Sequence, residues 1–134
     1  MSDDDTRNDL KHKTAETART YFEGYPWDKP YELWCCFDEE LAKDLSMFIT
    51  GKMYARQKLS HPTRQLVAIA ALTALGRDVE LRLHIWAGFN VGLTLEEMAE
   101  TIFQIGVYAG MPQVNRALCV LKEAHEAWEA RSVK

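Results

Sequence analysis

The chain has 134 residues, of which 47% are hydrophobic and 27% are charged, and its formal net charge is −4. This length suits one domain with a modest core, and the composition is that of a globular protein rather than a disordered one. The 16 Lys and Arg are scattered among 20 Asp and Glu without a basic block, which argues against a nucleic-acid partner.

The first part of the chain predicts two helices separated by an aromatic loop. Residues from about Arg7 to Phe22 are polar on most faces, which is typical of a peripheral helix. Pro26 and Pro30 then interrupt any helix, and we expect the loop to pack down through its large apolar side chains, Trp27, Tyr31, Trp34 and Phe37. Residues 38–51 carry apolar side chains at steps of three and four, and Gly51 is suited to end that helix.

The signals for helices sharpen from Ser60 onward. Ser60 can cap a helix that has Pro62 in its first turn and ends at Gly76. Asp78 can cap the next helix, which runs to about Asn90. Because only Gly76 and Arg77 connect these two helices, they must be antiparallel neighbours.

Two more helices complete the pattern. Thr94 and Glu97 have the spacing of a capping box, and the helix that they open ends near Gly110. The last helix is expected at about Gln113 to Arg131. No segment alternates as a β-strand does, so the predicted fold is all-α with a central antiparallel helix pair.

The predicted organisation is a single domain over residues 1–134, with residues 1–37 as a peripheral helix and aromatic loop and residues 38–131 as the helical core. The segment Leu66 to Leu75 is apolar nearly all round, which is more than one short chain easily covers. We therefore expect a homo-oligomer.

The cysteines and the first residues indicate the cellular context. Cys35 and Cys36 are adjacent and Cys119 lies far downstream, without metal-ligand or redox spacing, so we expect a reducing cytoplasm. The acidic start MSDDDTRNDLKHK is unlike a signal peptide. The longest apolar run is far shorter than the roughly 20 residues that cross a bilayer, so no membrane partner is expected.

Glu80 and His84 are the residues that most suggest catalysis. They are four residues apart on one helix and therefore share a face, where they can form a hydrogen bond. A carboxylate on one imidazole nitrogen fixes the tautomer and leaves the other nitrogen to exchange a proton near neutral pH. The alternatives are a surface ion pair or a core histidine with a structural partner. Val79, Leu81 and the residues that follow are expected to surround the pair with apolar side chains. A charged pair costs stability in such surroundings, and a function is one reason to retain it.

The stretch from Gly51 to about Glu126 resembles the carboxymuconolactone decarboxylase family. The matching residues are Gly51 and Tyr54, LSHPTRQLVAIAALTALGRDVELRLH ending at His84, Asn90-Val91-Gly92, and VYAGMPQVNRAL from Val107. The resemblance implies an all-helical oligomer, a trimer or hexamer, that acts on a lactone in aromatic catabolism without metal or organic cofactor. A sister branch of AhpD-like peroxidases carries Cys-x-x-Cys-x-x-x-His on the equivalent helix.

Thiol peroxidase chemistry is disfavoured because Arg77 and Glu80 occupy the two cysteine positions of that sister branch. We expect Cys35 and Cys36 to be small buried residues beneath the aromatic loop. The family pattern around His-x-Arg-Ala-Ala also differs here, since Trp86 replaces the arginine, and Gly88 and Phe89 depart as well. Loss of an arginine removes a bidentate anion site and adds an apolar plate, so Trp86 is expected to form a pocket wall.

The remaining candidates are assigned to substrate binding. Arg64 can hold a carboxylate or pair with a neighbouring acid, and Tyr54 and Tyr108 can donate to a lactone oxygen or be satisfied by backbone. Asn115 can orient a ligand or cap a turn. His61 is expected at a helix start and His125 in solvent, so no metal site is predicted around Glu80 and His84.

The resemblance implies that His84, oriented by Glu80, donates a proton or stabilises an oxyanion during decarboxylation of a carboxylated unsaturated lactone. Two alternatives stay open. One is a lactone isomerase, hydrolase or related lyase that acts on a more apolar ring, and the other is a non-catalytic helical oligomer that binds a small aromatic-derived acid.

Overall fold

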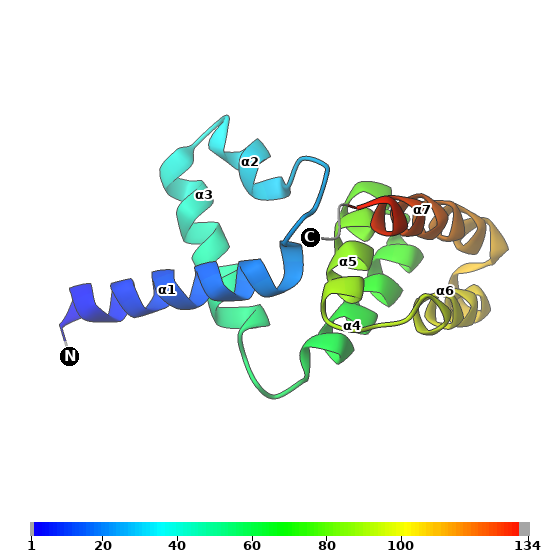
Figure 1. Cartoon of the computed structure of the whole chain (residues 1–134), viewed down its shortest axis with the longest axis horizontal. Helices are drawn as coiled ribbons and strands as arrows, with labels where there is room; N and C mark the ends of the chain where they lie inside the picture. Colours follow the sequence, from blue (N-terminus) through cyan, green and yellow to red (C-terminus); the bar gives the residue numbers. More distant parts are fainter. Residues whose placement is uncertain (1, 132–134) are drawn as a thin grey trace. The chain divides into compact units, whose positions relative to one another are not determined.

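The structure is a computed structural model that describes residues 2–131, and every regular element in that range is helical. The elements are α1 (Asp3–Phe22), α2 (Pro30–Cys35), α3 (Glu39–Ser46), the π-helix η1 (Met47–Tyr54), α4 (His61–Leu75), α5 (Asp78–Asn90), α6 (Leu95–Ala109) and α7 (Met111–Ala130) (Figure 1). The predicted all-α class is confirmed. Within residues 2–131, no helix combines the length and the apolar character needed to cross a membrane.

The chain divides into two compact units, Met1–Leu59 and Ser60–Lys134. The boundary that sequence analysis placed after residue 37 therefore lies inside the first unit, because α2 and α3 contact each other across it. The expectation that residues 1–134 act as one domain stays a prediction.

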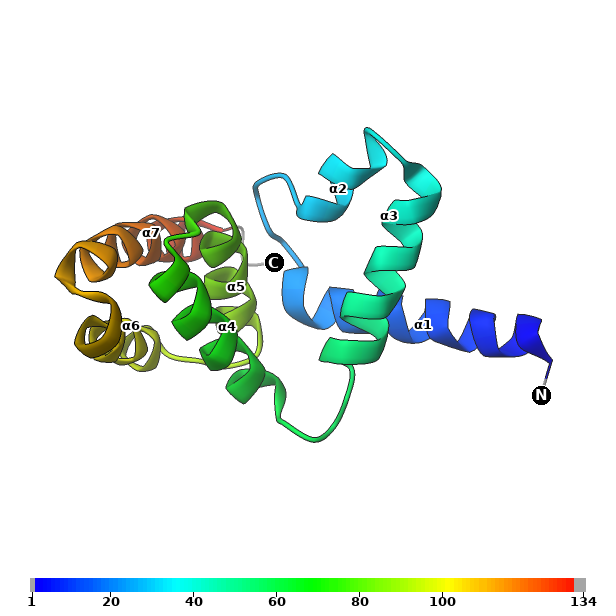
Figure 2. The same cartoon turned by 180° about the vertical axis from the view of Figure 1, so that it is seen from behind.

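The first unit is built on the packing of α1 against η1. Gly51 was expected to end a helix, but the chain continues through it as η1 to Tyr54. A Cβ at this position would overlap the Thr14 side chain of α1 and meet Leu10 Cδ1 at 3.0 Å. The glycine is therefore needed for the close approach of α1, not for termination. Figure 2 shows, from behind, α1 crossing the helical segment that continues from α3 into η1.

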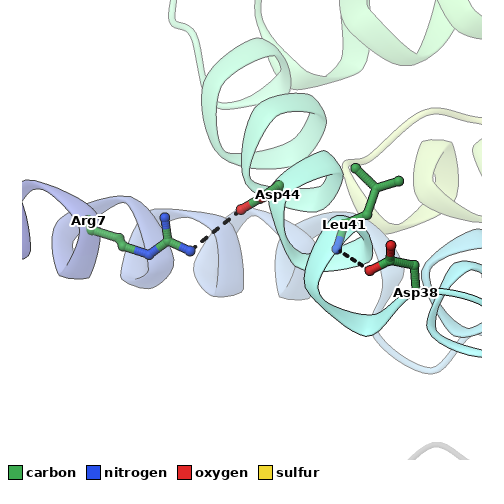
Figure 3. Close-up of polar contacts among 4 residues, drawn as sticks. All are labelled: Arg7, Asp38, Leu41 and Asp44. Carbon is green, nitrogen blue, oxygen red and sulfur yellow. Dashed lines mark hydrogen bonds and ion pairs between the residues drawn. The ribbon is translucent and has the colours of Figure 1, made fainter.

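Two polar contacts hold α3 within this unit (Figure 3). Arg7 of α1 forms a 3.5 Å ion pair with Asp44 of α3. Asp38 caps α3, because its Oδ1 accepts from the backbone N–H of Leu41 at 2.9 Å. Both contacts are exposed, so each contributes little to the stability of the unit.

The aromatic loop differs from expectation in two respects. Pro30 begins α2 instead of excluding a helix, because the first helical turn needs no N–H from that residue. Phe37 is 86% exposed and Tyr31 37% exposed, so neither packs down fully. Cys36 is also exposed, and its thiol donates to the Glu32 carbonyl at 3.4 Å, which corrects the expectation of a buried cysteine pair.

The second unit consists of α4, α5, α6 and α7 around one apolar core (Figures 1 and 2). Its buried members are Ile69, Leu81, Ile85, Leu93, Met98, Ile102, Val114, Ala117, Val120, Leu121 and Ala124. All four helices contribute to this set or pack against it, so the unit has a core of its own.

The predicted ends of these helices are largely confirmed. Ser60 Oγ accepts from the Thr63 N–H at 3.3 Å, Gly76 ends α4 in the left-handed conformation with φ +70°, and Thr94 and Glu97 form the reciprocal capping box of α6. Asp78 is the exception. It is the first residue of α5 rather than its cap, and its carboxylate pairs with Arg116 of α7 at 3.1 Å.

Candidate active site

His84 lies in the middle of α5 and contacts α4 through its imidazole ring. Its Nδ1 is 2.8 Å from Oε1 of Gln65, a residue with no exposed surface in the first half of α4. A carbonyl oxygen only accepts hydrogen bonds, so Nδ1 carries the hydrogen and donates it to Gln65. The neutral ring then has its lone pair on Nε2, which is the nitrogen that can accept a proton.

Burial sets the charge of this imidazole. It lowers the pKa of His84 from 6.5 to about 4, because burial removes water from around the charged form. Gln65 is neutral and cannot offset this cost with an opposite charge. At pH 7 His84 is therefore a neutral base with a fixed tautomer.

Glu80 differs from its predicted position. Its side chain is exposed, and among residues 2–131 no hydrogen bond joins it to His84. A carboxylate costs more to bury than an amide does, so the neutral Gln65 takes the buried place beside Nδ1. The orienting contact that was expected from Glu80 comes from Gln65 instead.

Gln65 was not recognised from the sequence, although a usable signal was present. It is a polar residue on the buried face of α4, in line with Ile69 and Thr73 at steps of four. A polar side chain on the buried face of an apolar helix needs a partner, and that requirement points to a residue on a packed helix.

The two substrate-binding candidates nearest to His84 in the sequence lie on α4 and α5. Arg64 is half-buried in the first turn of α4 and directly precedes Gln65. Trp86 is 1% exposed, and its ring meets that of Trp128 edge-on with centroids 5.0 Å apart. Arg64 is therefore placed beside the Gln65–His84 pair along the chain, and Trp86 is anchored in the core.

Tyr108 and Asn115 lie at the other end of the second unit. Both are exposed, and they flank the corner where α6 meets α7. Gln113, at this corner, donates from Nε2 to the Ala74 carbonyl at the last turn of α4 at 3.2 Å. Ala74 is nine residues from Gln65, about 14 Å along the helix axis, so the second unit does not bring these two residues to His84. Tyr54 belongs to the first unit, where its ring meets that of Tyr21 edge-on at 5.4 Å.

An aromatic cluster accounts for the differences from the family pattern around residue 86. Trp128 of α7 stacks on Phe89 at 5.2 Å and receives the edge of Trp86, while the Arg131 guanidinium lies 3.6 Å from the Trp128 ring centroid. Gly88 fits the same packing, because a Cβ there would meet Met98 Sδ at 2.8 Å. The replacement of arginine by tryptophan thus ties α5 to α7.

His125 Nε2 lies 3.3 Å from a carboxylate oxygen of Glu129, one turn further along α7. Across the part of the chain that the structure describes, no three His, Cys, Asp or Glu side chains gather as metal ligands would.

Residues 39–123 match the model of the carboxymuconolactone decarboxylase family. The chain belongs to this family. It is 41% identical over 87 residues to the 4-carboxymuconolactone decarboxylase of Acinetobacter baylyi (strain ATCC 33305 / BD413 / ADP1), and the match covers 65% of each chain.

A second relative is the uncharacterized 15.0 kDa protein in the nqo9-nqo10 intergenic region of Paracoccus denitrificans. It is 34% identical over 77 residues, or 56% of this chain and 58% of the relative. The matches therefore span less than two thirds of either relative. The family segment includes Arg64, Gln65, Glu80 and His84.

Proposed function

We propose that the chain catalyses cofactor-independent decarboxylation of a γ-carboxylated, α,β-unsaturated lactone similar to 4-carboxymuconolactone, in aromatic catabolism. The observation that carries the proposal is the half-buried His84, held at 2.8 Å by Gln65 inside the segment that matches the decarboxylase family. The 41% identity to a 4-carboxymuconolactone decarboxylase supports the same reaction type.

The reaction needs little more than binding, charge stabilisation and one proton. As the bond between the ring carbon and the carboxylate breaks, its electron pair moves through the ring double bond into the lactone carbonyl, which gives CO2 and a dienolate. One proton delivered to ring carbon then restores the carbonyl. The substrate is its own electron sink, so the protein has to stabilise the oxyanion and supply that proton.

His84 is proposed as the group that carries the proton. Its pKa of about 4 keeps it neutral before substrate binds. A carboxylated substrate brings negative charge to the imidazole, and an opposite charge nearby raises the pKa of a histidine. His84 then takes up a proton on Nε2 while Nδ1–H stays bonded to Gln65, and it returns that proton to the dienolate carbon.

The other predicted residues take supporting parts in this proposal. Arg64 holds a substrate carboxylate through its guanidinium group, and Trp86 forms the apolar boundary of the site together with the aromatic cluster. Glu80, one turn before His84 and exposed, is proposed as a second acid–base group. Tyr54, Tyr108 and Asn115 remain proposed ligand contacts.

The test measures CO2 and the ring product after incubation of 4-carboxymuconolactone with wild type, His84→Ala and His12→Ala. His12 is exposed on α1, so its variant is a matched histidine control. We expect wild type and His12→Ala to release CO2, and His84→Ala to be slower by about 10²–10⁴-fold. Isomerisation or hydrolysis without CO2 would assign the site to the rival lactone chemistry, and binding without any product would assign a non-catalytic role.

A further inference from the structure

Gln65 has a second functional group that the contact with His84 leaves unused. Its Oε1 accepts from His84, whereas its Nε2 is buried and has no hydrogen-bond partner among residues 2–131. A primary amide nitrogen carries two N–H donors. Buried donors are nearly always paired in native proteins, and an unpaired one is a place where a ligand acceptor stabilises the complex.

The identity of the missing partner follows from the donor. Two N–H groups beside a neutral imidazole fit an sp² oxygen, such as a carboxylate or a lactone carbonyl oxygen, and do not fit a cation or another N–H donor. The same amide is rigidly placed, because its oxygen is already held at 2.8 Å by His84. A ligand oxygen bound to Gln65 Nε2 would therefore lie close to the imidazole.

We propose that Gln65 acts at both ends: its Oε1 fixes His84 as the Nδ1–H tautomer, and its Nε2 donates to an oxygen of the substrate. Gln65 is thus a positioning residue for His84 and a binding residue for the ligand. The binding half of this proposal rests on the proposed function for the choice of ligand. The positioning half, which concerns the tautomer of His84, does not depend on any reaction.

Nitrogen NMR tests the positioning half on the whole protein. In ¹⁵N-histidine-labelled wild type near pH 7, the ring signals of His84, assigned by their loss in His84→Gln, are expected to be those of the Nδ1–H tautomer. Gln65→Glu keeps an acceptor oxygen, so the hydrogen is expected to stay on Nδ1, and the added negative charge favours the imidazolium. Gln65→Met has a similar length but no acceptor, and is expected to shift His84 toward the Nε2–H tautomer.

Thr73→Val provides the matched control. Thr73 lies two turns after Gln65 on the same buried face of α4, and its Oγ1 is also buried without a partner in the described chain. Its replacement alters buried polarity on the same helix without touching the amide, so the His84 signals are expected to stay as in wild type.

Ligand titration tests the binding half. The probes are a saturated γ-lactone that carries a carboxylate, which cannot lose CO2 by this route, unsubstituted γ-butyrolactone and acetate. We expect the Gln65 side-chain NH₂ signals of wild type to move with the carboxylated lactone, and the affinity to fall by about tenfold or more in Gln65→Met and Gln65→Glu. A response to γ-butyrolactone would identify the carbonyl as the acceptor, and a response to acetate would identify the carboxylate.

The outcomes separate this proposal from the proposed function. An Nε2–H tautomer of His84 in wild type overturns the positioning half, and this needs no variant to fold. NH₂ signals that no probe moves, or equal affinity in Gln65→Met, overturn the binding half. If the tautomer and the NH₂ response are as expected but 4-carboxymuconolactone yields no CO2, the role of Gln65 stands and the decarboxylase function fails.

Discussion

Acid should destabilise this protein through His84. The pKa of His84 is about 4 in the folded chain and 6.5 when it is free in water, because burial disfavours the imidazolium. The unfolded chain therefore binds a proton at a pH where the folded chain does not. Stability from this residue is fully present above about pH 6.5 and is lost as the pH falls toward about 4.

The size of the effect follows from the two pKa values. A difference of one pKa unit corresponds to 1.36 kcal/mol, so the interval from 6.5 to about 4 corresponds to about 3 kcal/mol of unfolding free energy. This is a large share of the 5–15 kcal/mol typical of small domains.

Urea unfolding of wild type and His84→Gln between about pH 7 and pH 4 measures the contribution of His84 to the unfolding free energy. Glutamine has no charge in this range, so subtracting the two curves removes the titration of all other groups. We expect the stability of wild type relative to His84→Gln to fall by about 3 kcal/mol over that range. A constant difference between wild type and His84→Gln would refute the assignment of His84 as a buried neutral histidine.

Three further predictions concern catalysis and assembly. Replacing Cys35, Cys36 and Cys119 together by serine should leave CO2 release within about twofold of wild type, since Arg77 and Glu80 occupy the thiol positions of the peroxidase branch; a folded but inactive triple variant would contradict this. Glu80→Gln should lower turnover by a factor that multiplies with that of His84→Ala, because no hydrogen bond joins the two side chains in residues 2–131; a double variant no worse than His84→Ala would restore the interpretation of one oriented pair. Phe103 and Val107 on α6 are 50% and 79% exposed, so changing both to glutamate should reduce the size of the proposed homo-oligomer in sedimentation. The control Gln104→Glu on the same helix should leave the size unchanged. An unchanged size of the double variant would place the interface elsewhere.

The ends of helices were predictable from the sequence where residues close together in the chain determine them. The Thr94–Glu97 capping box, the Ser60 cap and the left-handed Gly76 are all set within one turn of chain, and each is present in the structure. The helix pair α4–α5 followed from the two-residue link between them. Exposure was less predictable, because Phe37 and Glu80 take positions that depend on what packs nearby rather than on their own periodicity.

Gly51 illustrates the same limit for backbone conformation. Its position after an apolar helical pattern is typical of a terminator. The structure uses it instead where the side chain of Thr14 approaches, 37 positions earlier in the chain. A contact of that kind depends on the crossing of two helices and leaves no local sequence signal.

The Gln65–His84 contact was missed because helix register is not set by spacing alone. His84 lies eight residues after Gly76, which is about 12 Å along α5. Gln65 lies eleven residues before Gly76, which is about 16 Å along α4. Equal distances from the turn would have paired His84 with Ala68. Gln65 is three residues further from the turn than Ala68, which is close to one helical turn. The length of the glutamine side chain is part of what spans this difference.

This register predicts that side-chain length matters as much as chemistry at position 65. Gln65→Asn keeps the amide but removes one methylene, which withdraws the carbonyl oxygen by about 1.5 Å. The 2.8 Å contact with Nδ1 would then exceed the roughly 3.5 Å limit of a hydrogen bond unless the helices shift. We expect the His84 ring signals of Gln65→Asn to resemble those of Gln65→Met rather than those of Gln65→Glu. If Gln65→Asn retained the Nδ1–H tautomer, the helices would have to be free to slide, and the contact would reflect amide chemistry without a fixed register.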